Sequence, residues 1–272
     1  MTSGNQADDP QDLPPEIPFG VPTAARMYDA ALGGKDNFEV DRIANEKLYA
    51  AIGEKVVRGT AQENRLFLAR AVKYLANECG VQQFLDLGSG LPTAHNTHEI
   101  AQQADPRSKV VYVDIDPIVA VHGRALLAAD NTRIVTADMR KPETVLDNPA
   151  TRELIDFSRP VALLFVAVFH FTPPSDDPAG IIAAFRERQV PGSYVTIAHL
   201  TTDGMSPDER RGWLAGFDGA ANQLALRSEK EIRGLFDGYE LVKPGLVRPH
   251  LWRPEDDGSP ETTSLFAGVG RL

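Results

Sequence analysis

The sequence has a single cysteine, no long apolar run and no recognisable export signal, and each shortage excludes a class of protein. Cys79 stands alone, so no intramolecular disulfide can form and nothing indicates an oxidising compartment. The longest apolar run, residues 161–168, is far too short to cross a bilayer. Residues 1–18 hold four acidic side chains and four prolines without an apolar core, unlike a secretory signal. We therefore expect a cytoplasmic protein with no membrane contact.

Basic residues are also scarce, with 28 Lys and Arg against 38 Asp and Glu and a net charge of −10. Binding to the phosphates of a nucleic acid needs a basic surface that displaces counterions. A nucleic acid is therefore an unexpected partner, and a small molecule is favoured. The 272 residues suffice for one large domain with a helical cap, and they are compatible with a homo-oligomer. No cluster of His, Cys or carboxylates predicts a metal site.

Strand-like and helix-like segments alternate through the middle of the chain. Short β-rich segments are predicted at residues 83–87, 109–113, 132–137, 161–168 and 193–199. Helices are predicted between them at residues 95–104, 117–129 and 179–188. This alternation predicts an α/β fold, in which helices cover both faces of a parallel sheet.

The two ends of the chain do not show this alternation of strands and helices. Residues 1–20 are polar and Pro-rich and predict a disordered tail, residues 21–80 predict an N-terminal helical cap, and residues 81–272 predict the ligand-binding domain. Helices are expected at residues 23–51, with a break at Gly33-Gly34, and at 62–78, 207–225 and 228–235. The segments 239–247 and 262–269 follow as strands without a helical crossover, so they are expected to be antiparallel.

Three predicted strands end in residues that suit a nucleoside ligand. The first ends in Gly88-Ser89-Gly90, where glycines allow a tight turn and a close approach to a ligand. The second ends in Asp114, which can accept hydrogen bonds from both ribose hydroxyls. The third ends in Asp138 and Met139, where the acid can accept from an adenine amino group and the thioether can pack on the ring. Ligands of parallel sheets bind beyond such strand ends.

Two cofactors use this layout, and a purely structural explanation also exists. The dinucleotide pattern needs a third glycine where this chain has Thr93, which disfavours an NAD-linked oxidoreductase. S-adenosylmethionine has no phosphate, so the turn needs only close approach, and this cofactor is favoured. Alternatively, Asp114 and Asp138 cap the helices that follow them. Asp116 competes with Asp114 for the ribose, although its place before Pro117 suits a helix cap better.

Several segments resemble an actinobacterial family of class I S-adenosylmethionine-dependent methyltransferases, formerly classed as a domain of unknown function. They are PTAARMYDAALGGKDNFEVDR, FLDLGSGLPTAHNTHEIAQ, VVYVDIDPIVAVHGRALL, PVALLFVAVFHF, GSYVTIAHLT and FDGYELVKPGLVRPHLWRP. The resemblance runs from about Pro22 to the C-terminus. It implies a Rossmann-like class I methyltransferase fold, with a seven-stranded, mostly parallel sheet whose last strands are antiparallel. It also implies cofactor contacts from Gly88, Gly90, Asp114 and Asp138, under an N-terminal helical cap.

The same resemblance makes residues of the predicted cap candidates for cofactor contacts. Arg26 or Lys35 can hold the cofactor carboxylate, and Tyr28 can cover the sulfonium by a cation–π contact. The alternative is a surface helix that ends at Gly33-Gly34 and carries solvated charges. The expected cofactor contacts are completed by a short set of neighbours, namely Ser89, Ile115, Met139, Ala167 and Gly33.

One histidine is a candidate for catalysis. His170 follows the fourth strand and can act as a general base, or it can be a packed histidine, and His199 is a second candidate. Trp213 and Trp252 either line an acceptor cavity or pack in the core, and packing is favoured. The predicted function is an S-adenosylmethionine-dependent methyltransferase with an unidentified, small-molecule acceptor. Its rival is a non-catalytic module that binds S-adenosylmethionine or its product S-adenosylhomocysteine, whose strand ends would look the same.

Overall fold

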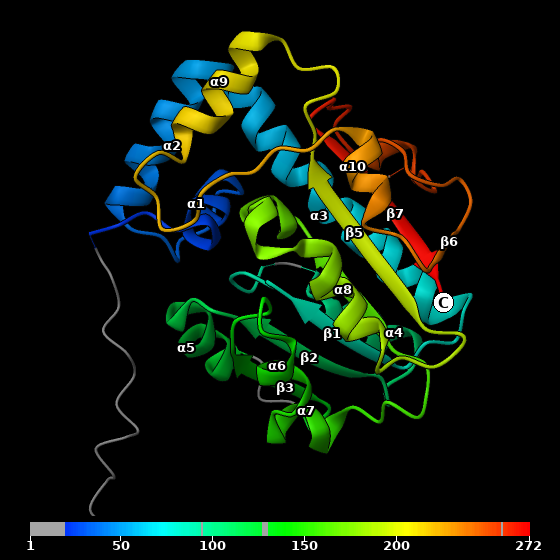
Figure 1. Ribbon diagram of the computed structural model, residues 1–272. Helices are drawn as coiled ribbons and strands as arrows, with labels where there is room; N and C mark the ends of the chain where they lie inside the picture. The colour runs from blue at the N-terminus through cyan, green and yellow to red at the C-terminus, as the bar shows by residue number, and fades with distance from the viewer. Residues whose placement is uncertain (1–19, 94, 127–129, 257) are drawn as a thin grey trace, which may run out of the picture.

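The computed structural model describes residues 20–272 except 94, 127–129 and 257, and a seven-stranded sheet lies at its centre (Figure 1). The strand order is β3-β2-β1-β4-β5-β7-β6, with β7 antiparallel to β5 and β6 and the other neighbours parallel. The strands are β1 (Gln83–Leu87), β2 (Lys109–Asp114), β3 (Thr132–Thr136), β4 (Ala162–Val166), β5 (Tyr194–Leu200), β6 (Glu240–Leu241) and β7 (Leu265–Arg271). The predicted Rossmann-like sheet with antiparallel last strands is confirmed. The predicted tail, residues 1–20, lies outside the described residues apart from Gly20.

Helices cover both faces of this sheet. They are α1 (Ala24–Ala31), α2 (Glu39–Ile52), α3 (Glu54–Asn77), α4 (Thr97–Ala104), α5 (Pro117–Leu126), α6 (Pro142–Leu146), α7 (Pro149–Leu154), α8 (Pro178–Arg186), α9 (Pro207–Gly216) and α10 (Glu229–Gly234). Successive strand residues point to opposite faces. Phe84 packs with α3 and α4, whereas its neighbour Leu85 packs in the core that α6, α7, α8 and α10 complete. In the described part of the chain, no helix has the length and apolarity needed to span a membrane.

The strand order reverses between β1 and β4, because the chain crosses from β3 back to the other side of β1. Ligands of open α/β sheets bind at such a reversal, beyond the carboxyl ends of the strands. Helices α1, α2 and α9 gather at that end (Figure 1) and share an apolar cluster with the first part of α3. Met27, Val57 and Trp213 belong to this cluster, while Phe67, later in α3, packs on the sheet. Helix α3 is therefore shared by the cap and the sheet, and α9 joins the cap from far along the chain.

Two predicted elements are much shorter in the structure. The helix expected over 207–225 ends at Gly216, and Gly219 beyond it has a φ of +77°, which leaves helical geometry. The strand expected over 239–247 is reduced to β6, because Pro244 has no N–H to donate to a neighbouring strand. Helices α6 and α7 were not predicted.

Candidate functional site

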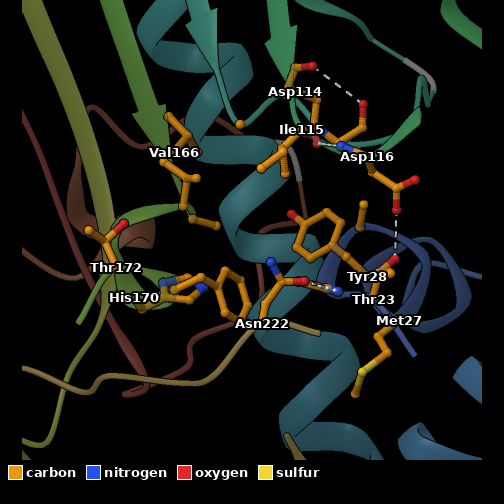
Figure 2. A pocket seen from close by; sticks show the side chains of 18 of the residues that line it. Thr23, Met27, Tyr28, Asp114, Ile115, Asp116, Val166, His170, Thr172 and Asn222 are labelled. Carbon is orange, nitrogen blue, oxygen red and sulfur yellow. Dashed lines mark hydrogen bonds between the residues drawn. The ribbon is translucent and has the colours of Figure 1, made fainter. Parts of the chain in front are cut away.

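A cavity of about 700 Å³ lies between the strand ends and the cap (Figure 2). This volume is within the range of small-molecule sites. One wall comes from the residues that follow β1, β2, β3 and β4, and the other comes from α1, α2, α3 and α9. Figure 2 shows Asp114 and Ile115 at one end, Met27 at the other, and Tyr28 and Asn222 between them. The three strand ends that were predicted to converge all line this one space.

The glycine turn after β1 is held to β2 by its backbone. Gly88 N–H donates to the Val113 carbonyl at 2.8 Å, and Gly90 N–H donates to Asp114 Oδ2 at 2.8 Å. Both glycines have left-handed φ values, +70° and +65°. A Cβ on Gly88 would lie 2.2 Å from Val168 Cγ2, whereas a Cβ on Gly90 would meet no atom within 4 Å. Gly88 therefore permits packing, and Gly90 leaves open space on the wall of the cavity.

The two acids near the end of β2 have different surroundings. Asp114 accepts from the N–H groups of Gly90 and Asp116, and burial raises its pKa to about 6. Asp116 accepts from the N–H of Ile118 and from the Thr23 hydroxyl, both at 2.9 Å. Asp116 therefore caps α5 and ties the cap to the sheet, whereas Asp114 is bonded to the glycine turn and to the backbone of its own loop.

Asp138 and Met139 line the cavity after β3. Arg140 contacts both oxygens of Asp138, with N–O distances of 2.8–3.1 Å. Burial raises the pKa of Asp138, but the hydrogen bonds and the charge of Arg140 outweigh it, and the pKa lies below its ordinary value. A ligand at Asp138 would share this carboxylate with Arg140. Three further expected contacts also line the cavity, namely Ser89, Ile115 and Ala167.

Four charged residues of the cavity wall were not predicted as site residues, namely Arg65, Asp86, Arg140 and Asp176. Asp86, near the end of β1, accepts from the Thr97 hydroxyl at 2.7 Å, and burial raises its pKa to about 6 against the opposing effects of Thr97 and Arg65. Arg65, on α3, donates to the His95 carbonyl at 3.1 Å and brings a cation near Asp86. No sequence signal marks Arg65, because tertiary packing determines which side of α3 meets the cavity.

The four candidates of the N-terminal segment separate in the structure. Tyr28 lines the cavity, and its ring is visible in the centre of Figure 2. Arg26 is fully buried and forms an ion pair of 3.1 Å with Asp41, so it joins α1 to α2 and is not among the lining residues. Gly33 and Lys35 are exposed beyond the end of α1 and do not line the cavity either. The structure brings only Tyr28 to the site.

His170 lines the cavity from the turn that follows β4. Its Nδ1 accepts from the N–H of Leu200 at 3.4 Å, which leaves the proton of the neutral ring on Nε2. Burial, together with His199 and the charge of Arg227, lowers the pKa of His170 well below its usual value, so the ring is neutral at pH 7. In this geometry Nε2 is a hydrogen-bond donor, which favours that role over the predicted one of general base.

Arg227 and His199 support the turn that carries His170, on the side away from the cavity. Arg227 donates to the carbonyls of Phe169 at 2.8 Å and Thr172 at 2.6 Å, and to His199 Nε2 at 2.7 Å. His199 is fully buried outside the cavity lining, and burial lowers its pKa to about 3. Both residues position the turn that carries His170.

The two tryptophans occupy different places. Trp252 packs edge-on against Phe67 and Tyr74, with ring centroids 5.5 and 5.7 Å apart, as expected for a core residue. Trp213 is also buried, in the cluster of the cap, but it lines the cavity as well. Trp213 therefore both packs in the core of the cap and lines the cavity.

Comparison with known proteins places the chain among methyltransferases. Residues 10–272 match a family described as S-adenosyl methyltransferase. A provisionally named methyltransferase from Thermobifida fusca YX is 44% identical, with a TM-score of 0.87 over 93% of this chain and 96% of that one. A DUF574 family protein from Streptomyces avermitilis MA-4680 is 36% identical, with a TM-score of 0.89 over 94% and 99%. Mitomycin 7-O-methyltransferase, 18% identical with a TM-score of 0.50 over 92% and 73%, shares the fold alone. No protein with a curated description matches.

The family match decides between the two cofactors that the strand ends left open. Its cofactor is S-adenosylmethionine, with S-adenosylhomocysteine as the product. The open space at Gly90 and the carboxylate of Asp114 on the same wall fit such a ligand. Because the match spans nearly the whole sequence, the chain belongs to the S-adenosyl methyltransferase family.

Proposed function

We propose that this protein transfers the methyl group of S-adenosylmethionine to a small-molecule acceptor bound in the same cavity. The observation that carries the proposal is one continuous cavity, which extends from the strand end at Asp114 to a region lined by the cap. When bound, S-adenosylmethionine supplies a sulfonium methyl group, which an acceptor nucleophile takes as the carbon–sulfur electron pair returns to sulfur. The net charge of −10 supports a small acceptor over a nucleic acid.

The strand-end wall supplies the cofactor contacts. Asp114 would accept from the ribose hydroxyls, and Ile115 and Met139 would pack on the adenine. Asp138 would accept from the adenine amino group beside Arg140. Gly88, Ser89, Gly90 and Ala167 would form the backbone wall.

We propose that Arg65, and not Arg26 or Lys35, binds the methionine carboxylate of the cofactor. It lines the cavity near the glycine turn, whereas the other two cations lie outside the lining. A guanidinium can hold a carboxylate through two parallel hydrogen bonds. Tyr28 would cover the sulfonium side through its aromatic face.

The acceptor side needs few chemical groups. In-line displacement at a methyl carbon depends mainly on positioning and on the exclusion of water. The cap covers one side of the cavity, and His170 would donate a hydrogen bond from Nε2 to the acceptor. A base is required only for a nucleophile with a proton of high pKa.

Calorimetry with S-adenosylhomocysteine tests the cofactor site. The wild-type protein should bind it with micromolar affinity or better, about −8 kcal/mol. Asp114→Asn should weaken binding by about 1.5–3 kcal/mol, because hydrogen bonds to a charged acceptor are lost. Asp116→Asn is the matched control and should leave the affinity nearly unchanged. Equal losses of affinity in the two variants would show that Asp114 does not bind the ribose. Absence of binding to the wild type would refute the proposed function.

The non-catalytic binding module is the second candidate. The region of the cavity under the cap favours the enzyme, since a module that only reports on its ligand needs no space for an acceptor. The two are separated by incubating the protein with S-adenosylmethionine and a panel of small hydroxyl- and amine-bearing acceptors. Formation of S-adenosylhomocysteine above the acceptor-free background supports the enzyme, and its absence across the panel supports the module.

A further inference from the structure

Two hydrogen-bond donors on the cavity wall, His170 Nε2 and Asn222 Nδ2, have no partner among the described residues. Each side chain is held through its other polar atom, His170 through Nδ1 and Asn222 through Oδ1. Neither donor is one of the partnerless side-chain atoms of the described residues that lack accessible surface. Because both residues line the cavity, a ligand in the cavity can reach both donors.

The amide of Asn222 has a fixed orientation. Its Oδ1 accepts from the backbone N–H of Ala24, at 3.1 Å. A backbone N–H can only donate, so the oxygen of the amide lies on that side and the nitrogen lies on the other. Figure 2 shows the nitrogen directed into the space between Tyr28 and His170. Asn222 therefore presents N–H groups to the centre of the cavity.

The segment that carries Asn222, after α9, is anchored on both sides of this residue. Ala221 N–H donates to the Pro22 carbonyl at 3.0 Å, and Ala225 N–H donates to the His170 carbonyl at 2.7 Å. The first bond holds the segment to the cap, and the second holds it to the turn that carries His170. The two donors thus belong to connected parts of one wall, and their positions are set before a ligand binds, which lowers the cost of binding a polar group.

The wall around these donors is apolar and aromatic. The ring of Phe171 lies 4.5 Å from that of His170 and 5.2 Å from that of Phe217, centroid to centroid. Both phenylalanines line the cavity, as do Met27 and Trp213 from the apolar cluster of the cap. An oxygen atom that enters such surroundings loses its hydrogen bonds to water unless donors of the wall replace them. The two donors therefore determine where a ligand can place an oxygen atom.

Building on the proposed function, we infer that the methyl acceptor has an apolar body and an oxygen atom that accepts hydrogen bonds, as a carbonyl does, and that Asn222 binds this oxygen. The apolar body packs on Phe171 and Trp213. Asn222 Nδ2 donates to the oxygen, on the same wall as the donor Nε2 of His170. Because Ala24 fixes the amide, the position of this bond orients the acceptor in the cavity. The structure thus assigns Asn222 as a determinant of acceptor specificity.

Two probes of nearly the same shape test this inference on protein saturated with S-adenosylhomocysteine. They are 2-acetylnaphthalene and 2-isopropenylnaphthalene, in which a CH2 group replaces the carbonyl oxygen. An apolar wall without donors prefers the alkene, because the ketone must give up its hydrogen bonds to water. With the N–H groups of Asn222 available, the ketone should bind about fivefold more tightly in calorimetry. Equal binding of the two probes, tighter binding of the alkene, or no binding of either would overturn the inference.

A matched pair of variants locates the effect at Asn222. Asn222→Asp and Asn148→Asp both keep a side-chain oxygen that accepts from a backbone N–H, that of Ala24 in one case and that of Ala150 in the other. Asn148 caps α7 and does not line the cavity. Asn222→Asp replaces the donor with an acceptor, so it should weaken the ketone about tenfold and change the alkene less than twofold. Asn148→Asp should change neither.

Three results with Asn222→Asp would contradict the role of Asn222. They are an unchanged affinity for the ketone, equal losses for the two probes, and a tenfold loss of affinity for S-adenosylhomocysteine, which would place Asn222 at the cofactor. Failure of S-adenosylhomocysteine to bind the wild type would instead refute the proposed function, so the two failures are distinguishable.

Discussion

At the scale of single residues, buried carboxylates make the site sensitive to pH. Burial raises the pKa of Asp114 and of Asp86 to about 6. Because the pKa of an unfolded Asp is lower, the folded apo protein binds more protons than the unfolded chain between about pH 4 and pH 6. Asp114 therefore contributes stability at low pH and loses that contribution as the pH rises through 6. The affinity for the ligand changes with pH in the opposite direction. It increases as the pH rises, because ribose hydroxyls donate best to the ionised carboxylate.

The affinity for S-adenosylhomocysteine should consequently fall about tenfold between pH 7 and pH 5, as Asp114 becomes protonated. Calorimetry at several pH values measures this fall. Asp114→Asn, already weaker at pH 7, should show a smaller slope, with the remainder due to Asp86. A wild-type affinity that does not change over this range would show that the ionised form of Asp114 does not hold the ligand.

At the scale of elements, the cap over the cavity depends on the close packing of α9 against α2. Gly216, the last residue of α9, lies so near α2 that a Cβ there would be 2.5 Å from Leu48 Cδ1 and 3.2 Å from Leu48 Cβ. Leu48 is itself a buried residue of the cap cluster. The absence of a side chain at Gly216 therefore permits the contact between two helices that are distant in the sequence.

Gly216→Ala should destabilise the protein by about 1–3 kcal/mol, because Leu48 or α9 must move. Gly234→Ala is a suitable control, since Gly234 ends α10 and a Cβ there would meet no atom within 4 Å. That control should be neutral or stabilising by up to about 1 kcal/mol. Denaturant unfolding of the two variants makes the comparison, and equal stability of both would mean that α9 and α2 do not pack closely in solution.

At the scale of the whole molecule, the cap and the segment after α9 are tied together around the cavity. Ala221 N–H donates to the Pro22 carbonyl at 3.0 Å, and Ala24 N–H donates to Asn222 Oδ1 at 3.1 Å. Ala24, Ala221 and Asn222 all line the cavity. A ligand in the cavity would therefore contact both the sheet and the cap, and its binding energy would stabilise the whole fold.

S-adenosylhomocysteine at about one hundred times its dissociation constant should stabilise the fold by about 2.7 kcal/mol, which raises the unfolding midpoint by about 5 °C for a chain of this size. Thermal unfolding with and without the ligand measures the shift. NAD at the same concentration is the control and should give no shift. A shift with NAD as large as that with S-adenosylhomocysteine would contradict the selectivity of the site.

Local patterns in the sequence determined the sheet and the strand-end wall. Strands buried on both faces read as apolar runs, and a parallel sheet brings their carboxyl ends to one edge. The sequence therefore predicts that the turn 88–90, Asp114 and Asp138 lie together at one edge of the sheet. These positions depend on short-range features, namely a left-handed backbone and an acid immediately after a strand.

Only the tertiary structure decided which helical residues meet the cavity. Arg26 and Arg65 both lie on helices near the site, but Arg26 is paired with Asp41 while Arg65 lines the cavity. The part of the cavity under the cap, lined by Leu48 and Trp213, depends on the packing of α9 on α2, although these helices are far apart in the sequence. Helical periodicity shows that a helix has an apolar face, but the partner of that face depends on contacts between distant segments, which no local pattern records.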